Sequence, residues 1–128
     1  MPPTLVPELE VADLAVSVAF YVEVCGFALS YERREDGFAY LERGAAELML
    51  EQAGPASGRG LGMNLQIEVS DVDALRDRVV RAGSKVVREL EERWYRRGDA
   101  KRGNRQFVVA DPDGYLLRFF QDLGARPA

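Results

Sequence analysis

Two short stretches of the chain alternate apolar and polar side chains. LVPELEV (residues 5–11) and MNLQIEV (residues 63–69) carry Leu, Val or Ile at every second position toward their ends. A period of two residues is typical of a β-strand with one buried face. The intervening Glu, Asn and Gln side chains then lie on the other face. They either line the concave side of a pocket or face solvent, as the outer faces of antiparallel sheets do.

A helical pattern follows each of these strands. Asp13 and Asp71 stand where a short carboxylate can accept from the free N–H groups of a first helical turn. Apolar residues then recur near a 3.6-residue period until Gly26 and Gly83. Glycine suits the left-handed conformation after a helix end. The expected helices span residues 14–25 and 72–82.

The two halves of the chain repeat one order of elements. The tetrapeptide VADL (11–14) recurs as VSDV (69–72), and internal repeats indicate repeated supersecondary units. Three extended segments follow each helix, separated by turn signals such as Asp-Gly and Asp-Pro-Asp-Gly. The segments are FALSYERR, FAYLERG and AELMLEQ in the first half, and SKVVRELE, RQFVVAD and YLLRFFQ in the second.

This order predicts an α+β fold of two βαβββ modules that form a curved mixed sheet around a cavity, with the helices outside. The modules are expected over residues 1–53 and 63–128, joined by the Gly-, Pro- and Ser-rich linker GPASGRGLG at 54–62. The whole chain, 1–128, is expected to be a single domain. The pattern leaves open whether the modules pair within one chain or across a dimer.

Composition narrows the chemistry that this chain can perform. It has no histidine, and catalytic zinc and non-haem iron sites nearly always use imidazole ligands. Ser-His-Asp catalysis and histidine acid–base catalysis are excluded for the same reason. The single cysteine, Cys25, lies in the apolar stretch VEVCGF, which indicates a packed, unreactive thiol. Any enzyme made from this chain must use carboxylates, Tyr, Lys, Arg or Cys25. Our expectation is no metal, no cofactor and no catalytic residue.

Charge is distributed unevenly along the chain. The net charge is −4, which argues against a nucleic-acid partner because nucleic-acid-binding proteins carry a basic face. Residues 1–64 hold ten acidic and four basic side chains, whereas segment 93–105, RWYRRGDAKRGNR, holds six basic and one acidic. We expect segment 93–105 to be a solvated loop. The alternative is a lid or a subunit contact that meets acidic groups.

The sequence contains no signal for membrane insertion or export. No apolar run approaches the roughly 18 residues that a membrane-spanning helix needs. The first ten residues, MPPTLVPELE, lack the basic and apolar regions of a secretion signal. We therefore expect no membrane partner and a cytoplasmic location.

Two spaced motifs resemble a known family. VADLAVSVAFYVEVCGF resembles the opening of proteins of the glyoxalase/bleomycin resistance protein/dioxygenase (vicinal oxygen chelate) superfamily, and DPDGYLLRF resembles their closing strand. The Val-Pro before the first strand and the segment WYRRGDAKRGNRQFVVADPDGYLLRF resemble the bleomycin-resistance branch. The resemblance covers nearly the whole chain and implies the paired βαβββ fold. Function does not follow from a fold alone.

Enzymes of this superfamily hold a divalent metal with side chains at four positions on their strands. Counting from the matched motifs locates these four positions in this chain. The four positions are Val6, Met49, Asn64 and Arg118. An aliphatic, a thioether, an amide and a guanidinium side chain do not suit a hard divalent ion. The resemblance therefore implies a protein that has lost the metal, unless nearby carboxylates rebuild a site. These carboxylates are Glu8, Glu10, Glu47 and Glu68.

Loss of the metal ligands fits the bleomycin-resistance branch, which binds its drug without chemistry. The resemblance implies a homodimer with two clefts, each of which sequesters one bulky, planar, cationic natural product such as bleomycin. Nine residues are our candidates for contact with this small-molecule ligand. They are Glu8, Phe38, Tyr40, Met49, Asn64, Gln66, Trp94, Tyr95 and Arg118.

The candidate residues differ in what they offer a ligand. Aromatic rings supply stacking area at low entropic cost, and we expect Trp94 and either Phe38 or Tyr40 to flank a planar group. Core packing is the alternative for Phe38 and Tyr40. Arg118 lies in the apolar strand YLLRFF and needs a partner, which is either an acidic side chain or an anionic ligand. We interpret four other residues as packing residues. They are Phe20, Tyr21, Leu29 and Tyr31.

Two other functions stay open. The first is a glyoxalase- or isomerase-like enzyme that works without metal through a carboxylate base such as Glu8 or Glu68. The second is a regulatory module with a sealed, apolar cavity. The polar side chains Asn64, Gln66 and Arg118 count against a sealed cavity.

Overall fold

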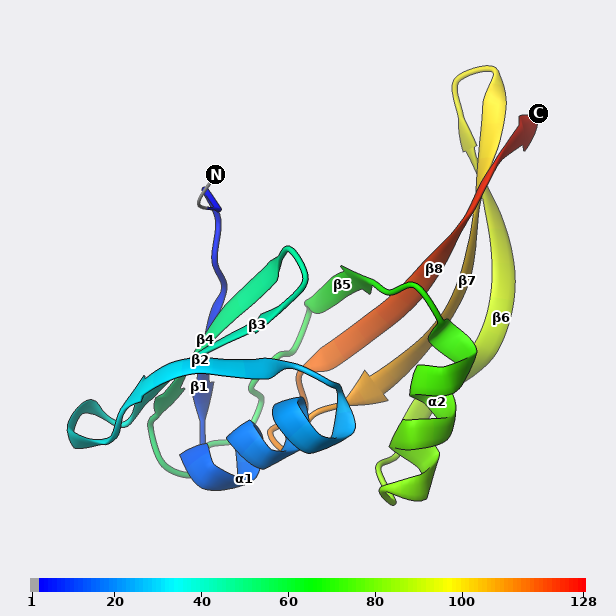
Figure 1. The fold of residues 1–128 in the computed structure, drawn as a ribbon. Helices are drawn as coiled ribbons and strands as arrows, with labels where there is room; N and C mark the ends of the chain where they lie inside the picture. Colours follow the sequence, from blue (N-terminus) through cyan, green and yellow to red (C-terminus); the bar gives the residue numbers. More distant parts are fainter. Residues whose placement is uncertain (1–2) are drawn as a thin grey trace. The chain divides into compact units, whose positions relative to one another are not determined.

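The computed structural model describes residues 3–128, which form two compact units (Figure 1). The first unit contains the chain up to Leu61 together with Asp111–Gly114, and the second contains Gly62–Ala110 and Tyr115–Ala128. Each unit holds one main helix and one four-stranded mixed sheet in the order βαβββ. The α+β fold class and the repeated βαβββ order predicted from the sequence are therefore confirmed.

The first unit builds its sheet in the order β1-β4-β3-β2, with β1 parallel to β4 and the other neighbours antiparallel. Its elements are β1 (Glu8–Val11), α1 (Leu14–Ala19), η1 (Phe20–Val24), β2 (Ala28–Arg33), η2 (Arg34–Asp36), β3 (Phe38–Arg43) and β4 (Ala46–Gln52). Alternate residues of β1, β3 and β4 are buried on the face that the helix covers, among them Leu9, Val11, Leu41, Leu48 and Leu50. The other face of the sheet, which α1 does not cover, is called the open face below.

The predicted helix at 14–25 is present as α1 followed by the wider turn η1. The Asp13 carboxylate accepts from the Val16 N–H over 3.3 Å, as a helix N-cap does. At the other end the Cys25 N–H donates to the Phe20 carbonyl, five residues back, over 3.1 Å. Gly26 then adopts a φ of 81° and ends the helix, a conformation that costs glycine little.

The Asp-Pro-Asp-Gly turn, which precedes the last strand of the sequence, belongs to the first unit. The Tyr21 hydroxyl donates to Asp111 Oδ2 over 2.7 Å, and both residues are buried. Burial and the Asp111 carboxylate hold the pKa of Tyr21 well above its usual value. Asp113 Oδ1 accepts from the Ala12 N–H over 2.9 Å and lies 3.3 Å from Arg59 Nη1. Residues from far along the chain thus fasten the start of α1 and its buried face.

The second unit repeats the strand order of the first, as β5-β8-β7-β6. Its elements are β5 (Asn64–Glu68), α2 (Val72–Arg81), β6 (Val86–Arg97), β7 (Ala100–Ala110) and β8 (Leu116–Pro127). The Asp71 carboxylate caps α2 by accepting from the Ala74 N–H over 3.0 Å, and Val72, Leu75 and Val79 are buried as predicted. Among residues 3–128, no helix is long and apolar enough to cross a bilayer.

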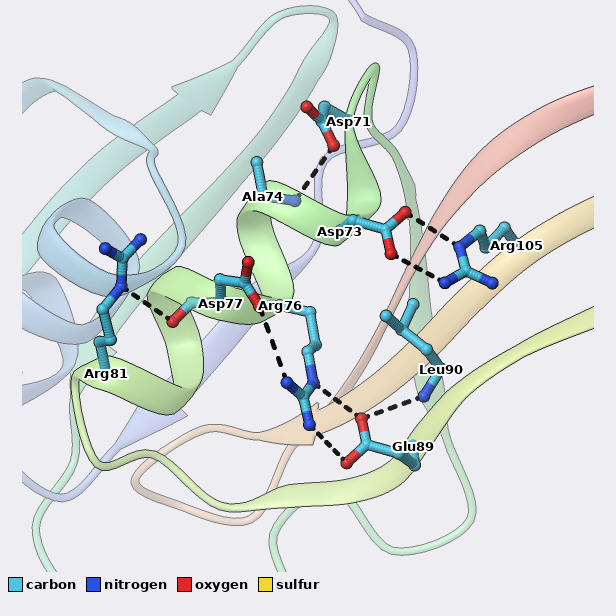
Figure 2. Close-up of polar contacts among 9 residues, drawn as sticks. All are labelled: Asp71, Asp73, Ala74, Arg76, Asp77, Arg81, Glu89, Leu90 and Arg105. Carbon is cyan, nitrogen blue, oxygen red and sulfur yellow. Dashed lines mark hydrogen bonds and ion pairs between the residues drawn. The ribbon is translucent and has the colours of Figure 1, made fainter.

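Two arginine–carboxylate pairs fasten α2 to its sheet (Figure 2). Arg76 donates to both carboxylate oxygens of Glu89 on β6, each over 2.9 Å, and Arg105 on β7 donates to both oxygens of Asp73 over 2.9 and 2.8 Å. Hydrogen bonds from the guanidinium groups hold the pKa of Asp73 and of Glu89 below their usual values. The pairs therefore stabilise the fold fully above the ordinary carboxyl pKa, and this contribution is lost as the pH falls through the lowered values.

Segment 93–105 is not the solvated loop that its composition predicts. β6 and β7 continue through it as an antiparallel hairpin, and the C-terminal part of β8 pairs along β7 (Figure 1). Trp94 lies against Gly103 on the neighbouring strand, and the guanidinium carbon of Arg126 is 3.9 Å from the centroid of the Trp94 ring. Strand pairing here relies on backbone hydrogen bonds and on this packing across strands. The number of charged residues in the segment gives no sign of either.

The Tyr21–Asp111 hydrogen bond can be tested by Tyr21→Phe, which keeps the ring and removes the donor. Loss of a buried hydrogen bond to a carboxylate costs about 1–3 kcal/mol, so we expect the free energy of unfolding to fall by that amount in urea denaturation. Tyr40→Phe is the matched control, because its hydroxyl bonds a carboxylate in only partly buried surroundings. Equal losses of unfolding free energy in Tyr21→Phe and Tyr40→Phe would contradict the larger contribution to stability expected of the buried bond.

Gly103→Ala tests the packing of Trp94. A Cβ at position 103 would lie 2.7 Å from three atoms of the Trp94 ring, so we expect this variant to lose about 1–3 kcal/mol of unfolding free energy. In a Trp94→Ala background the same change should cost much less, because the obstructing ring is gone. Urea unfolding followed by circular dichroism gives the unfolding free energy of the wild type, the two single variants and the double variant. An equal cost in both backgrounds would show that the ring does not rest on Gly103.

Candidate functional site

The open face of the first unit's sheet brings together the four candidate residues of the first half. Met49 on β4 is in register with Glu8 on β1 at one side and with Tyr40 on β3 at the other. Phe38 lies two residues from Tyr40 along β3, in register with Glu51. Because side chains alternate between the faces of a strand, these residues all project from the face that α1 does not cover.

A third aromatic residue, Tyr31 on β2, completes this group. The rings of Tyr31 and Tyr40 are stacked, with centroids 5.3 Å apart and planes 12° from parallel. The Tyr31 and Phe38 centroids are 6.0 Å apart. Tyr31 is 48% exposed and presents ring surface to solvent, whereas Phe38 is only 8% exposed. We call Tyr31, Phe38 and Tyr40 the aromatic platform.

Tyr31 was predicted from the sequence to be a packing residue. Its ring does stack on Tyr40, but it lies half-exposed on the open face rather than in the core. A bulge in β2 between Leu29 and Tyr31 shifts the register, so that Leu29 pairs with Leu41 and Tyr31 pairs with Tyr40. In a regular strand residues 29 and 31 share a face, but the bulge turns them to opposite faces. No residue in FALSYERR marks the bulge in advance.

A hydrogen bond fixes one end of the platform. The Tyr40 hydroxyl donates to Glu47 Oε1 over 2.7 Å. This bond, with smaller contributions from burial and from the charge of Glu47, raises the pKa of Tyr40 to about 12, because all three favour the protonated phenol. Tyr40 therefore stays neutral at physiological pH, and its ring is held in place for stacking.

An arginine from the same unit already covers part of the platform. The Arg33 guanidinium carbon lies 4.1 Å from the centroid of Phe38 and 5.9 Å from that of Tyr31. Asp36 holds Arg33 from the other side, with Nε and Oδ2 2.9 Å apart. A cation within about 6 Å of a ring face is attracted by the ring's quadrupole. The platform therefore already carries one planar cation, which belongs to the same unit.

Two carboxyl groups stand beside the platform on the neighbouring strands. A hydrogen bond to Glu8 and the charge of Glu8 raise the pKa of Glu51 above its usual value. Glu51 also pairs in register with Phe38 and with Glu10. The open face of this sheet thus carries acidic groups next to aromatic rings.

Three candidate residues of the second half lie together on the second unit. Gln66 on β5 is in register with Arg118 on β8, and Arg118 with Val108 on β7. Asn64 and Arg118 line one hollow of about 220 Å³, together with Val87, Arg88, Val108 and Leu116. Arg88 lines the same hollow as Arg118 but was not predicted from the sequence. Bulges in β6 break the regular alternation of side chains, so the sequence does not show which face Arg88 occupies.

Trp94 and Tyr95, which are neighbours in sequence, project from opposite faces of the second sheet. Tyr95 lies on the face of Arg118, and its hydroxyl accepts from Gln106 Nε2 over 3.0 Å. Trp94 lies on the other face, against Gly103. Within the second unit, Trp94 is therefore not brought to the hollow that holds Arg118. The expected pairing of Trp94 with Phe38 or Tyr40 stays a prediction.

A larger groove, of about 700 Å³, lies on the helix-covered side of the first unit. Ala15, Val18 and Val22 of the helix form one wall, and Leu29 on β2 forms another. The nine candidate residues do not line this groove. This groove is thus separate from the aromatic platform.

The residues at the superfamily's four metal positions do not fit a divalent ion. Met49 offers a thioether among acidic and aromatic neighbours, and Arg118 brings a positive charge into the hollow beside Asn64. In the part of the chain from residue 3 onward, no three His, Cys, Asp or Glu side chains gather closely enough to hold a metal. A metal-free protein stays a prediction, which rests on the chemistry of these side chains.

Comparisons with known proteins match this chain over nearly its whole length. Residues 6–119 match the family model described as Glyoxalase/Bleomycin resistance protein/Dioxygenase superfamily. A bleomycin resistance protein of Geobacillus stearothermophilus is 27% identical over 92% of this chain and 96% of its own. An uncharacterized protein of Mycobacterium tuberculosis is 30% identical over 88% of this chain and 71% of its own.

A solved structure agrees with the sequence comparisons. The crystal structure of TioX from Micromonospora sp. ML1 has a TM-score of 0.73 and 29% identity, and the match covers 94% of this chain and 99% of TioX. Family model, relatives and fold all lead to one conclusion. The chain belongs to the glyoxalase/bleomycin resistance protein/dioxygenase superfamily.

Proposed function

We propose that this protein binds a bulky, planar, cationic small molecule on the aromatic platform, without a metal and without chemical conversion. Bleomycin is the first ligand to test, because relatives at 27% identity are named bleomycin resistance proteins. The observation that carries the proposal is the guanidinium of Arg33 on Phe38, with carbon and ring centroid 4.1 Å apart. The platform holds an internal planar cation in the manner proposed for the ligand.

Two interactions of the platform favour such a ligand. Stacking on an aromatic side chain contributes about 0.5–1.5 kcal/mol beyond the area that it buries. A cation over a ring face adds about 0.5–2 kcal/mol, depending on how well it is desolvated. Glu8, Glu47 and Glu51 surround the rings with acidic groups, which attract a cation and disfavour an anion at this face.

The remaining candidate residues enter the proposal as polar and aromatic contacts. Asn64, Gln66 and Arg118 offer amide and guanidinium groups on one face of the second sheet, and Trp94 and Tyr95 offer further ring surface. The proposal also includes a homodimer and a cytoplasmic location. The family resemblance supports the homodimer.

Tyr31→Leu tests the platform directly. We expect isothermal titration with metal-free bleomycin to give saturable binding in the micromolar range or tighter by wild-type protein. Loss of the stacked ring should weaken this affinity by about threefold to tenfold. Tyr31→Phe keeps the ring and is the matched control, with affinity close to that of the wild type. Absence of binding by the wild type would remove bleomycin as the ligand, and equal affinity in Tyr31→Leu would remove the platform as its site.

One observation favours a second function, a glyoxalase- or isomerase-like enzyme that acts through carboxylates. The hydrogen bond with Glu8 raises the pKa of Glu51, and a carboxyl with a raised pKa is better suited to transfer protons near neutral pH. If this function is present, turnover of methylglyoxal–thiol adducts should persist in the presence of chelator and fall at least tenfold in Glu51→Gln. Tyr40→Phe, which leaves both carboxyl groups in place, is the control. Absence of turnover by metal-free wild-type protein would eliminate this second function.

A further inference from the structure

A row of side chains crosses all four strands of the second unit's sheet. The register pairs Gln66 on β5 with Arg118 on β8, Arg118 with Val108 on β7, and Val108 with Arg88 on β6. Residues directly opposite each other on paired strands project from the same face. The row therefore sets two guanidinium groups on either side of a valine, with a carboxamide at one end.

The row forms one side of a concave surface. Arg88, Val108 and Arg118 line the hollow of about 220 Å³ together with Asn64, Leu116 and Val87. Val108 is 8% exposed and forms the floor, while Arg118 is half-buried and Arg88 is exposed. Pockets for whole drug-sized ligands usually measure 300–1,000 Å³, so this hollow fits a single chemical group rather than a whole ligand.

The two guanidinium groups of the hollow lack acidic partners among the described residues. Four other arginines of the unit form ion pairs with carboxylates at 2.7–3.9 Å: Arg76, Arg93, Arg102 and Arg105. Arg88 and Arg118 form no such pair with any residue from 3 to 128. Four arginines of the unit are thus neutralised by carboxylates, whereas the two that line the hollow are not.

The nearest acidic side chains on this face belong to the next row of the sheet. Glu68 pairs in register with Phe120, Phe120 with Gln106, and Gln106 with Glu91. Glu91 is turned toward Arg93, with Oε1 3.9 Å from Nη1. Neither carboxylate reaches Arg118 or Arg88, so the positive charge of the hollow stays uncompensated.

We propose that this hollow, the Arg88–Arg118 cradle, binds an oxyanion group of a small molecule, such as a phosphate. Guanidinium groups donate paired hydrogen bonds whose geometry matches the oxygens of carboxylates and phosphates. Asn64 adds an amide N–H donor to the lining, and Val108 and Leu116 supply its apolar part. A half-buried charge such as Arg118 is costly without a partner, and the oxyanion supplies that partner.

The cradle shares Asn64 and Arg118 with the contacts of the proposed function, but its test with phosphate does not require that function to hold. The aromatic platform attracts cations and belongs to the first unit, whereas the cradle attracts anions and belongs to the second. The two ideas can fail separately, because each has its own probe and its own variants.

Titration of the full chain with inorganic phosphate tests the cradle, at constant ionic strength with chloride as the competing ion. Shifts of backbone amide resonances in NMR spectra should saturate for residues near the hollow. Arg118→Gln and Arg88→Gln should each weaken the fitted phosphate affinity at least tenfold. Arg97→Gln is the matched control. It lies on the same strand as Arg88, forms no ion pair among the described residues and removes the same charge, so it should leave the affinity within twofold.

Spectra without phosphate first establish that each variant is folded. Arg88 is exposed, so Arg88→Gln keeps the test valid even if Arg118→Gln is unstable. Phosphate binding should also persist in Tyr31→Leu, which separates the cradle from the platform. Shifts that stay linear in phosphate concentration, or equal weakening by Arg97→Gln, would overturn the proposal, because they indicate non-specific attraction to positive charge.

Discussion

The first unit depends on one buried hydrogen bond to a residue from the other half of the sequence. Tyr21 on the helix donates to Asp111, and Asp113 in the same turn accepts from the backbone at the start of that helix. A buried hydroxyl and a buried carboxylate are each costly without a partner, so helix, turn and sheet core form together. The face that α1 covers is thereby fixed, and with it the face that remains open for the aromatic platform.

Much of the fold could be predicted because local and long-range signals agree. The repeated pattern of strand, capping aspartate, apolar helix and glycine gave the order of elements. Asp13 and Asp71 cap the helices as expected. The positions of Glu8, Tyr40 and Met49 on one face also follow from simple alternation, which holds wherever strands are regular.

The predictions that failed concern features set by tertiary contacts. The bulge that turns Tyr31 to the open face leaves no mark in the sequence. Segment 93–105 looked like a loop because its charged residues hide a hairpin that Trp94, Gly103 and Arg126 hold by packing across strands. The Asp-Pro-Asp-Gly motif was correctly interpreted as a turn, but local sequence could not show which unit the turn belongs to.

One consequence concerns how the platform chooses its ligand. Arg33 already lies on Phe38, and Asp36 anchors it there. Under the proposed function, a ligand that stacks on the same face of Phe38 takes the place of the Arg33 guanidinium, so its binding is an exchange rather than a simple addition. A neutral planar molecule replaces the attraction between Arg33 and the ring with stacking alone. A cationic planar molecule stacks and also restores a cation–ring attraction. Discrimination between ligands is a difference of affinities. Because every ligand on this ring competes with Arg33, its affinity depends on how much more strongly than the guanidinium it interacts with Phe38.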